Sequence, residues 1–227
     1  MASGPSRFAT VDEADSYART IPDRFNYGDL SNLQRCLVAY RDADIRVVCH
    51  VQYIPNDTPS VRAIGFRAAE QGFFAEQRPD ADVVDFYTVS PYDLGAAISD
   101  AVRLGEPGRH ERVVGPEYLR PRSAQFDAGS VHVADQRRST YDTIIGEDQV
   151  TAYGRVQSDW RTAWKWSYAY DKPIGQFIRV VDDGEYLYDL EGCGAKPLTK
   201  PLLSKRIDEL IAEDVAVLRE MRAASGL

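Results

Sequence analysis

The spacing of apolar residues changes along the chain from a helical period to a strand period. Between Leu30 and Tyr40 leucines and a tyrosine recur three and four positions apart, which predicts a helix that begins near Asp29 or Ser31. From Ile45 to Tyr53 apolar and polar residues alternate, which predicts a strand, with a continued helix as the alternative. The first half of the chain is therefore expected to contain both kinds of element.

Capping patterns predict further helices in this half. Thr10 and Glu13 have the spacing of a capping box, in which both side chains satisfy free backbone amides. This helix is expected to stop before Pro22, which cannot donate a backbone hydrogen bond. Ser60 can cap another helix that continues to Phe73.

A strand and another helix are predicted next. Val83 to Val89 has the composition of a strand, and Pro91 permits a helix over Tyr92 to Leu104 that ends at Gly105. The segment from Glu106 to Gln125 is rich in glycine and proline, which is typical of loops and makes it the best candidate for a boundary.

From Ser130 onward the pattern is that of an antiparallel sheet. Asp183-Gly184 predicts a two-residue hairpin turn, which would pair Val181 with Tyr186. The predicted strands are Val131 to Ala134, Val150 to Val156, Trp160 to Tyr170, Phe177 to Val181 and Glu185 to Leu190.

A final amphipathic helix is expected from about Ser204, and its apolar stripe is wide. A stripe this wide favours packing on the same body over a free interaction arm. The residues of this stripe are Ile207, Leu210, Ile211, Val215, Leu218 and Met221.

Together these elements predict an α+β fold. A helical N-terminal half packs on a mostly antiparallel β-sheet, formed largely by residues 130–191, and a C-terminal helix closes it. The expected domains are a helix-rich α/β half over residues 1–125 and an antiparallel sheet plus C-terminal helix over residues 126–227. A single domain is the alternative.

Charge and composition limit the classes of partner and the location that we expect. The 227 residues include 27 Lys and Arg against 35 Asp and Glu, and the net charge of −8 disfavours binding to nucleic acid. No apolar run approaches the roughly 18 residues of a membrane span, and the first residues lack the pattern of a signal peptide. Three cysteines without metal-ligand spacing are typical of reduced thiols. We expect a protein of the cytoplasm or of a virion, with no membrane contact, cofactor or metal.

Two segments carry candidate binding residues. One face of the predicted strand after Trp160 would carry an aromatic row, Trp164, Trp166, Tyr168 and Tyr170. This row could be part of the core, a subunit interface or a platform on which sugar rings stack. The only concentrated basic patch is a candidate site for an acidic partner, because arginine suits paired carboxylates at interfaces. Its members are Arg109, Arg112, Arg120 and Arg122.

Catalytic patterns are largely missing from the sequence. It has no phosphate-binding loop, nucleophile elbow or zinc-binding helix of the known spacings. Cys49 and His50 are adjacent and would point to opposite faces of a strand, so they cannot form a catalytic pair. A hydrolase site assembled only in space, from Asp127, His132 and Cys193, is the alternative to a non-catalytic protein.

The segment from Phe8 to Tyr17 resembles the first helix of tailed-phage head–tail connector proteins, which often begin with a Thr-capped helix. The resemblance covers about ten residues and includes no catalytic position. It implies a structural protein of the virion. The sequence thus favours a non-catalytic structural or assembly protein with protein partners, in a homo-oligomer or a larger complex. A hydrolase and a carbohydrate-binding module that uses Trp164 to Tyr170 are the alternatives.

Overall fold

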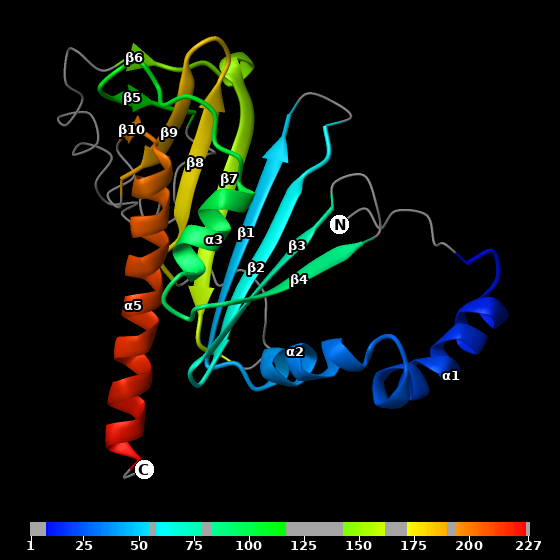
Figure 1. The fold of residues 1–227 in the computed structure, drawn as a ribbon. Coiled ribbons are helices and arrows are strands. Elements are labelled where there is room, and N and C mark those ends of the chain that lie inside the picture. Colours follow the sequence, from blue (N-terminus) through cyan, green and yellow to red (C-terminus); the bar gives the residue numbers. More distant parts are fainter. Residues whose placement is uncertain are drawn as a thin grey trace.

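The computed structural model describes residues 8–54, 58–78, 83–116, 143–161, 172–189 and 194–225. Ten described strands form one sheet in the order β4-β3-β2-β1-β7-β8-β9-β10-β5-β6 (Figure 1). Neighbouring strands pair antiparallel except β5 and β6, which pair in parallel. The strands are β1 (Ile45–Tyr53), β2 (Val61–Ala68), β3 (Gln71–Gln77), β4 (Val84–Val89), β5 (Val113–Val114), β6 (Thr143–Ile144), β7 (Val150–Asp159), β8 (Gly175–Val180), β9 (Gly184–Tyr188) and β10 (Ala195–Pro197).

Helices cover both faces of this sheet. The described helices are α1 (Val11–Tyr27), α2 (Ser31–Arg41), α3 (Leu94–Ala101) and α5 (Lys200–Ala224), and a short 3-10 turn (Glu147–Gln149) precedes β7. Helices α3 and α5 pack on one face of β1 and its neighbours, where Ile98 and Ile207 are fully buried. Helix α2 packs on the other face, where Cys36 and Ala39 meet Phe66 of β2. The predicted α+β class, with a C-terminal helix closing an antiparallel sheet, is therefore confirmed.

The sheet draws on more of the chain than the sequence predicts. The expectation that residues 130–191 form most of it is wrong, because β1 to β4 all precede residue 90. Strand β1 pairs with β2 on one side and with β7 on the other, so one sheet includes strands from both predicted halves. The predicted strand over Val131 to Ala134 lies outside the described residues.

The prediction of a helix from Ser60 to Phe73 is wrong. The segment forms the hairpin of β2 and β3, in which Ala68 pairs with Gln71 across a turn whose Ala69 has a positive φ of 52°. The residues around this turn favour helices by intrinsic propensity. Pairing of β2 with β1 gives its backbone groups partners in the sheet, and this tertiary contact outweighs the local preference.

The hairpin register predicted for the second half is also wrong. Ile178, and not Val181, pairs with Tyr186, and Val180 pairs with Gly184. Three residues form the turn, and Asp182 adopts the positive φ of 55°. Asp183 instead uses its carboxylate, which accepts hydrogen bonds from the Tyr186 hydroxyl at 2.6 Å and from the Arg109 amide at 2.8 Å.

Several predicted ends of helices and strands differ from the structure. Helix α1 continues through Pro22 to Tyr27, at the cost of one backbone hydrogen bond. Helix α5 begins at Lys200, where the Thr199 hydroxyl accepts a hydrogen bond from the Leu202 amide at 3.3 Å. Strand β7 ends at Asp159, so Trp160 and Arg161 follow it outside any strand. The Thr10 cap of α1 is confirmed, because its hydroxyl accepts from the Glu13 amide at 3.2 Å.

Candidate interaction surfaces

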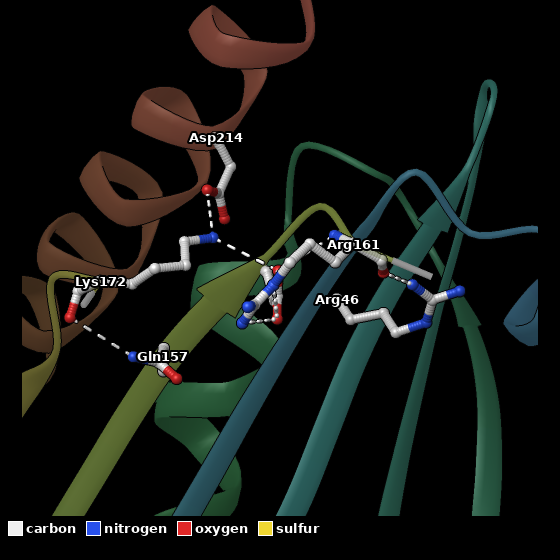
Figure 2. Close-up of polar contacts among 6 residues, drawn as sticks. Arg46, Gln157, Arg161, Lys172 and Asp214 are labelled. Carbon is white, nitrogen blue, oxygen red and sulfur yellow. Dashed lines mark hydrogen bonds and ion pairs between the residues drawn. The ribbon is translucent and has the colours of Figure 1, made fainter. Parts of the chain in front are cut away.

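Asp159, the last residue of β7, lies between two basic side chains. Arg161 donates from Nε and Nη2 to its carboxylate at 3.0 and 2.9 Å. The Lys172 Nζ lies 3.5 Å from Asp159 Oδ1 and 2.5 Å from Oδ1 of Asp214 on α5 (Figure 2). Burial by itself raises the pKa of Asp159, but the hydrogen bonds from Arg161 and the charge of Lys172 outweigh it and hold this pKa below its usual value. The charged network therefore ties α5 to the end of β7.

The same network anchors both borders of the aromatic segment. Arg161 precedes residues 162–171 and Lys172 follows them, and both bind the carboxylate of Asp159. The Gln157 side chain also donates to the backbone carbonyl of Lys172 at 3.5 Å. Chain positions before and after the segment are thus held at one place on the sheet.

Arg46 fixes α2 to this end of the sheet, and it is fully buried on β1. Its Nη2 donates to the carbonyl of Tyr40 at 2.8 Å, and its Nη1 donates to the carbonyl of Arg161 at 2.6 Å (Figure 2). Burial lowers the pKa of Arg46 from its ordinary value. Because Tyr40 is in the last turn of α2, the guanidinium satisfies a carbonyl that the helix leaves without an internal partner. The sequence pattern places Arg46 among the polar positions of β1 and does not reveal this role.

Of the five predicted aromatic residues, the structure describes Trp160. Trp160 is half-buried and packs against the main core cluster under α5. Trp164, Trp166, Tyr168 and Tyr170 lie outside the described residues, and their assignment as core, interface or sugar platform stays a prediction.

The predicted arginine patch separates into two roles where it is described. Arg109 is exposed, and its backbone amide is held by Asp183. The Arg112 Nη2 lies 3.5 Å from Oδ2 of Asp189, which joins its loop to the end of β9. Arg112 therefore stabilises the fold, whereas the side chain of Arg109 faces solvent. Arg120 and Arg122 lie outside the described residues.

The residues of the predicted hydrolase alternative, Asp127, His132 and Cys193, lie outside the described residues. Burial raises the pKa of Cys49 to about 12, so this thiol is protonated at neutral pH. Within the described ranges, no group of three or more His, Cys, Asp or Glu side chains is placed to hold a metal ion.

One histidine lies beside a carboxylate and a hydroxyl. His110 Nε2 is 3.9 Å from Oδ2 of Asp183, and its Nδ1 is 3.4 Å from the Thr143 hydroxyl. The same carboxylate holds the Tyr186 hydroxyl, whose pKa burial and this bond raise to about 12. The arrangement fastens the loop before β5 onto the β8–β9 hairpin.

Helix α1 presents an apolar stripe that the described part of the chain leaves unburied. Ala14, Tyr17, Ala18, Ile21 and Phe25 fall within about 100° on a helical wheel, which is the width of a core-facing stripe. Ala18 is exposed and the other four are half-buried. The helix contacts α2 and extends away from the sheet (Figure 1). The ring of Phe8 and the guanidinium of Arg24 partly cover Tyr17.

Helix α2 also leaves apolar side chains exposed. It buries Cys36 and Ala39 against the sheet, while Leu37 is 40% exposed and Val38 is 44% exposed. The leucine stripe that predicts this helix is therefore turned partly away from the core.

Helices long and apolar enough to span a membrane do not occur in the part of the chain that the structure describes.

Comparisons with known proteins show a likeness in fold and none in sequence family. No protein-family model and no curated protein matches the chain. It is similar to the type VII secretion system chaperone EspG5 from Mycobacterium tuberculosis, which was solved in complex with a PE25–PPE41 dimer. The identity is 14% and the TM-score 0.47, and the match covers 89% of this chain and 85% of that chain. At these values the likeness assigns neither a family nor a function.

Proposed function

We propose that this chain is a non-catalytic protein that binds partner proteins, and that helix α1 is its main binding arm. The observation that carries the proposal is the apolar stripe of α1, from which no residue is buried. A stripe with three- and four-residue spacing is the feature by which amphipathic helices dock on apolar grooves.

The expected partner surface is an apolar groove or a second helix with its own apolar stripe. Leaving such a stripe in water costs about 25 cal/mol for each Å² of apolar area that a partner would cover. Ala18 is a small and exposed member of the stripe, so a partner could approach the backbone of α1 closely there. Leu37 and Val38 of α2 add apolar area on the same helical arm.

The ion pairs at Asp159 tie α5 to the sheet, and the sheet is the firm base from which the α1 arm would extend. Arg46 fixes the C-terminal end of α2, and α2 in turn holds α1. The exposed Arg109 and the aromatic row Trp164 to Tyr170 are proposed as further contact residues. What supports the aromatic row is that both of its borders are anchored on Asp159.

Two narrower forms of the proposal follow from the sequence. A role in a phage head–tail connector is supported by the Thr10-capped helix α1. Assembly of several copies of this chain is supported by the apolar surface of α1 and α2. The mass of the protein that binds α1 distinguishes these two forms, because another virion protein and a second copy of this chain differ in mass.

Site-specific photo-crosslinking in cells of the source organism tests the proposal. A photoreactive amino acid at Ala18, on the stripe, is expected to give a discrete adduct, whereas the same substitution at Ser16, on the polar face, gives none. Adding Ile21→Asp is expected to abolish the Ala18 adduct, and the matched change Thr20→Asp is expected to leave it. An adduct of twice the chain mass would identify a second copy as the partner. Equal adducts from Ala18 and Ser16, or none from Ala18, would contradict the proposal.

A further inference from the structure

Three basic side chains form a row across the middle of the sheet. His50 of β1 pairs with Arg62 of β2 on one side and with Arg155 of β7 on the other, and the three strands lie side by side (Figure 1). Residues that pair directly point to the same face of a sheet. Adjacent strands are about 4.8 Å apart, so these three residues, the basic row, span about 10 Å.

The basic row lies on the face of the sheet opposite to α5. The residues next to its members along the strands, Cys49, Ala63 and Val156, belong to the core cluster under α3 and α5. Successive side chains of a strand point to opposite faces, so the row points away from these helices. On its own face, the apolar cluster beneath α2 reaches Ile64, and a second apolar cluster over β8 and β9 reaches Tyr153. The row lies between these two clusters.

The described side chains that adjoin the basic row on this face are uncharged. Arg62 is exposed, and its Nη1 donates to the Gln77 side chain at 3.5 Å. The guanidinium of Arg155 lies over the Tyr153 ring, 5.5 Å from its centroid. The other positions next to the row in the register are Val48, Gln52, Ile64, Gln157 and Gln176.

The middle of the row is polar and incompletely satisfied. Nε2 of the half-buried His50 is shielded from solvent and has no hydrogen-bond partner. A shielded polar atom without a partner costs free energy, which a bound hydrogen-bonding group would recover. Burial lowers the pKa of His50, and the positive charges of Arg62 and Arg155 lower it further. A negative group bound at the row would oppose this effect and favour the protonated imidazole.

The charge of the whole chain indicates which kind of anion fits. The net charge of −8 repels a long phosphate backbone, so nucleic acid is disfavoured. A short acidic segment of a protein carries fewer charges, and its carboxylates match the planar fork of an arginine. Carboxylates two positions apart in an extended segment point to the same side and are about 7 Å apart. Two long arginine side chains on strands about 10 Å apart can reach both.

We propose that the basic row binds the carboxylates of an acidic segment of a partner protein, which lies across β2, β1 and β7. Arg62 supplies an exposed guanidinium at one end, His50 supplies a hydrogen-bond donor in the middle, and Arg155 supplies positive charge at the other end. This goes beyond the function proposed above, because it concerns a separate surface and does not require α1.

A short fluorescent peptide that alternates aspartate with glycine is the probe, and its binding to the full chain is measured by fluorescence anisotropy at low salt. The matched control has asparagine in place of aspartate. The aspartate peptide is expected to bind, and the asparagine peptide is expected to bind at least about tenfold more weakly, a difference of about 1.4 kcal/mol. Single-stranded DNA of the same total charge is expected to bind more weakly than the aspartate peptide.

Two charge reversals at exposed positions locate the binding. Arg62→Glu reverses one charge of the row and is expected to weaken binding of the aspartate peptide by about tenfold or more. Arg219→Glu makes the same change in net charge on the exposed face of α5 and is expected to bind like the parent. Thermal unfolding of both variants checks that the fold is kept.

The pH dependence of binding tests the place of His50. The charged groups that face it from the neighbouring strands are Arg62 and Arg155. Between about pH 7.5 and about pH 5.5 the parent is expected to bind the aspartate peptide more tightly, because the imidazole gains a proton while the aspartates stay ionised. His50→Gln stays polar but cannot gain this proton, and its affinity is expected to be the same at both pH values.

The proposal is overturned if the aspartate peptide does not bind the parent chain, or if the asparagine peptide binds equally well. Equal binding by Arg62→Glu and the parent, or an equal loss in Arg219→Glu, overturns it as well. So does a pH effect that His50→Gln retains in full. Tighter binding of the DNA would identify nucleic acid as the ligand and would also overturn it. The variant Ile21→Asp on α1 is expected to bind the peptide normally, so this result is independent of the function proposed for α1.

Discussion

The two long helices at the ends of the described chain are both amphipathic, but the fold uses only one of them. Helix α5, of 25 residues, places Leu203, Ile207 and Leu210 in the main core, where they are at most 3% exposed. Helix α1, of 17 residues, has a well-formed apolar stripe and no buried residue. The two helices show that a helical stripe identifies a surface that avoids water, and not which molecule covers it.

The ion pairs of the two helices differ in burial in the same way. On α5, Asp214 is nearly buried and pairs with Lys172 at 2.5 Å. On α1, Arg24 pairs with Asp29 at 2.5 Å, but the Asp29 side chain is 64% exposed. A buried pair holds two elements together, whereas an exposed pair is screened by water.

The largest effect on stability is expected from breaking the buried ion pair on α5. Asp214→Ala leaves the charge of Lys172 poorly compensated in a buried place, which is expected to cost about 3–5 kcal/mol of unfolding free energy. Asp29→Ala is expected to leave the urea midpoint almost unchanged. Equilibrium urea unfolding of both variants checks this, and similar losses in the two would show that α1 is part of the folded core.

A matched pair of isoleucine truncations sharpens the comparison. Ile207→Ala on α5 is expected to cost about 2–5 kcal/mol, because it leaves a cavity under the helix. Ile21→Ala on α1 is expected to change stability by less than about 1 kcal/mol, because this side chain is only half-buried. Thermal and urea unfolding measure both. A large loss from Ile21→Ala would mean that the stripe is already used by the fold.

A smaller effect is expected from acid. The pKa of Asp159 is held below its unfolded value, so its contribution to stability is present above about pH 4, the unfolded pKa of an aspartate, and is lost as the pH falls through the lower folded pKa. Asp159→Asn is expected to be less stable than the parent at neutral pH and to lose less stability on acidification. Urea midpoints from neutral pH to about pH 3 give the two slopes, and parallel slopes would contradict the role of this network.

The sequence predicts elements well where one pattern dominates. Strand β1, strand β4, helix α2 and the C-terminal helix are found close to their predicted places, because their periodicity and their tertiary contacts agree. The β2–β3 hairpin is not predicted, since Arg67 to Gln71 favour helix locally. The hairpin forms because β2 pairs with β1 on one side and with β3 on the other.

The candidate sites are predicted less well, for a related reason. Arg46 and Asp214 read as ordinary polar positions, and only the packing of α2 and α5 on the sheet makes them buried. The basic row is also hidden in the sequence, because its three residues meet only through the pairing of β2, β1 and β7. Trp164 to Tyr170 and Arg120 to Arg122 remain predictions.

Amide hydrogen exchange of the isolated chain at low concentration tests most directly whether the fold leaves α1 unused. Amides in the first half of α5, around Ile207, are expected to exchange only on global unfolding, because they lie over the main core. Amides in α1, around Ile21, are expected to exchange far faster, through local opening that leaves the sheet intact. Equal protection of the two helices would contradict the account, because α1 would then be stabilised by the fold and not kept for a partner.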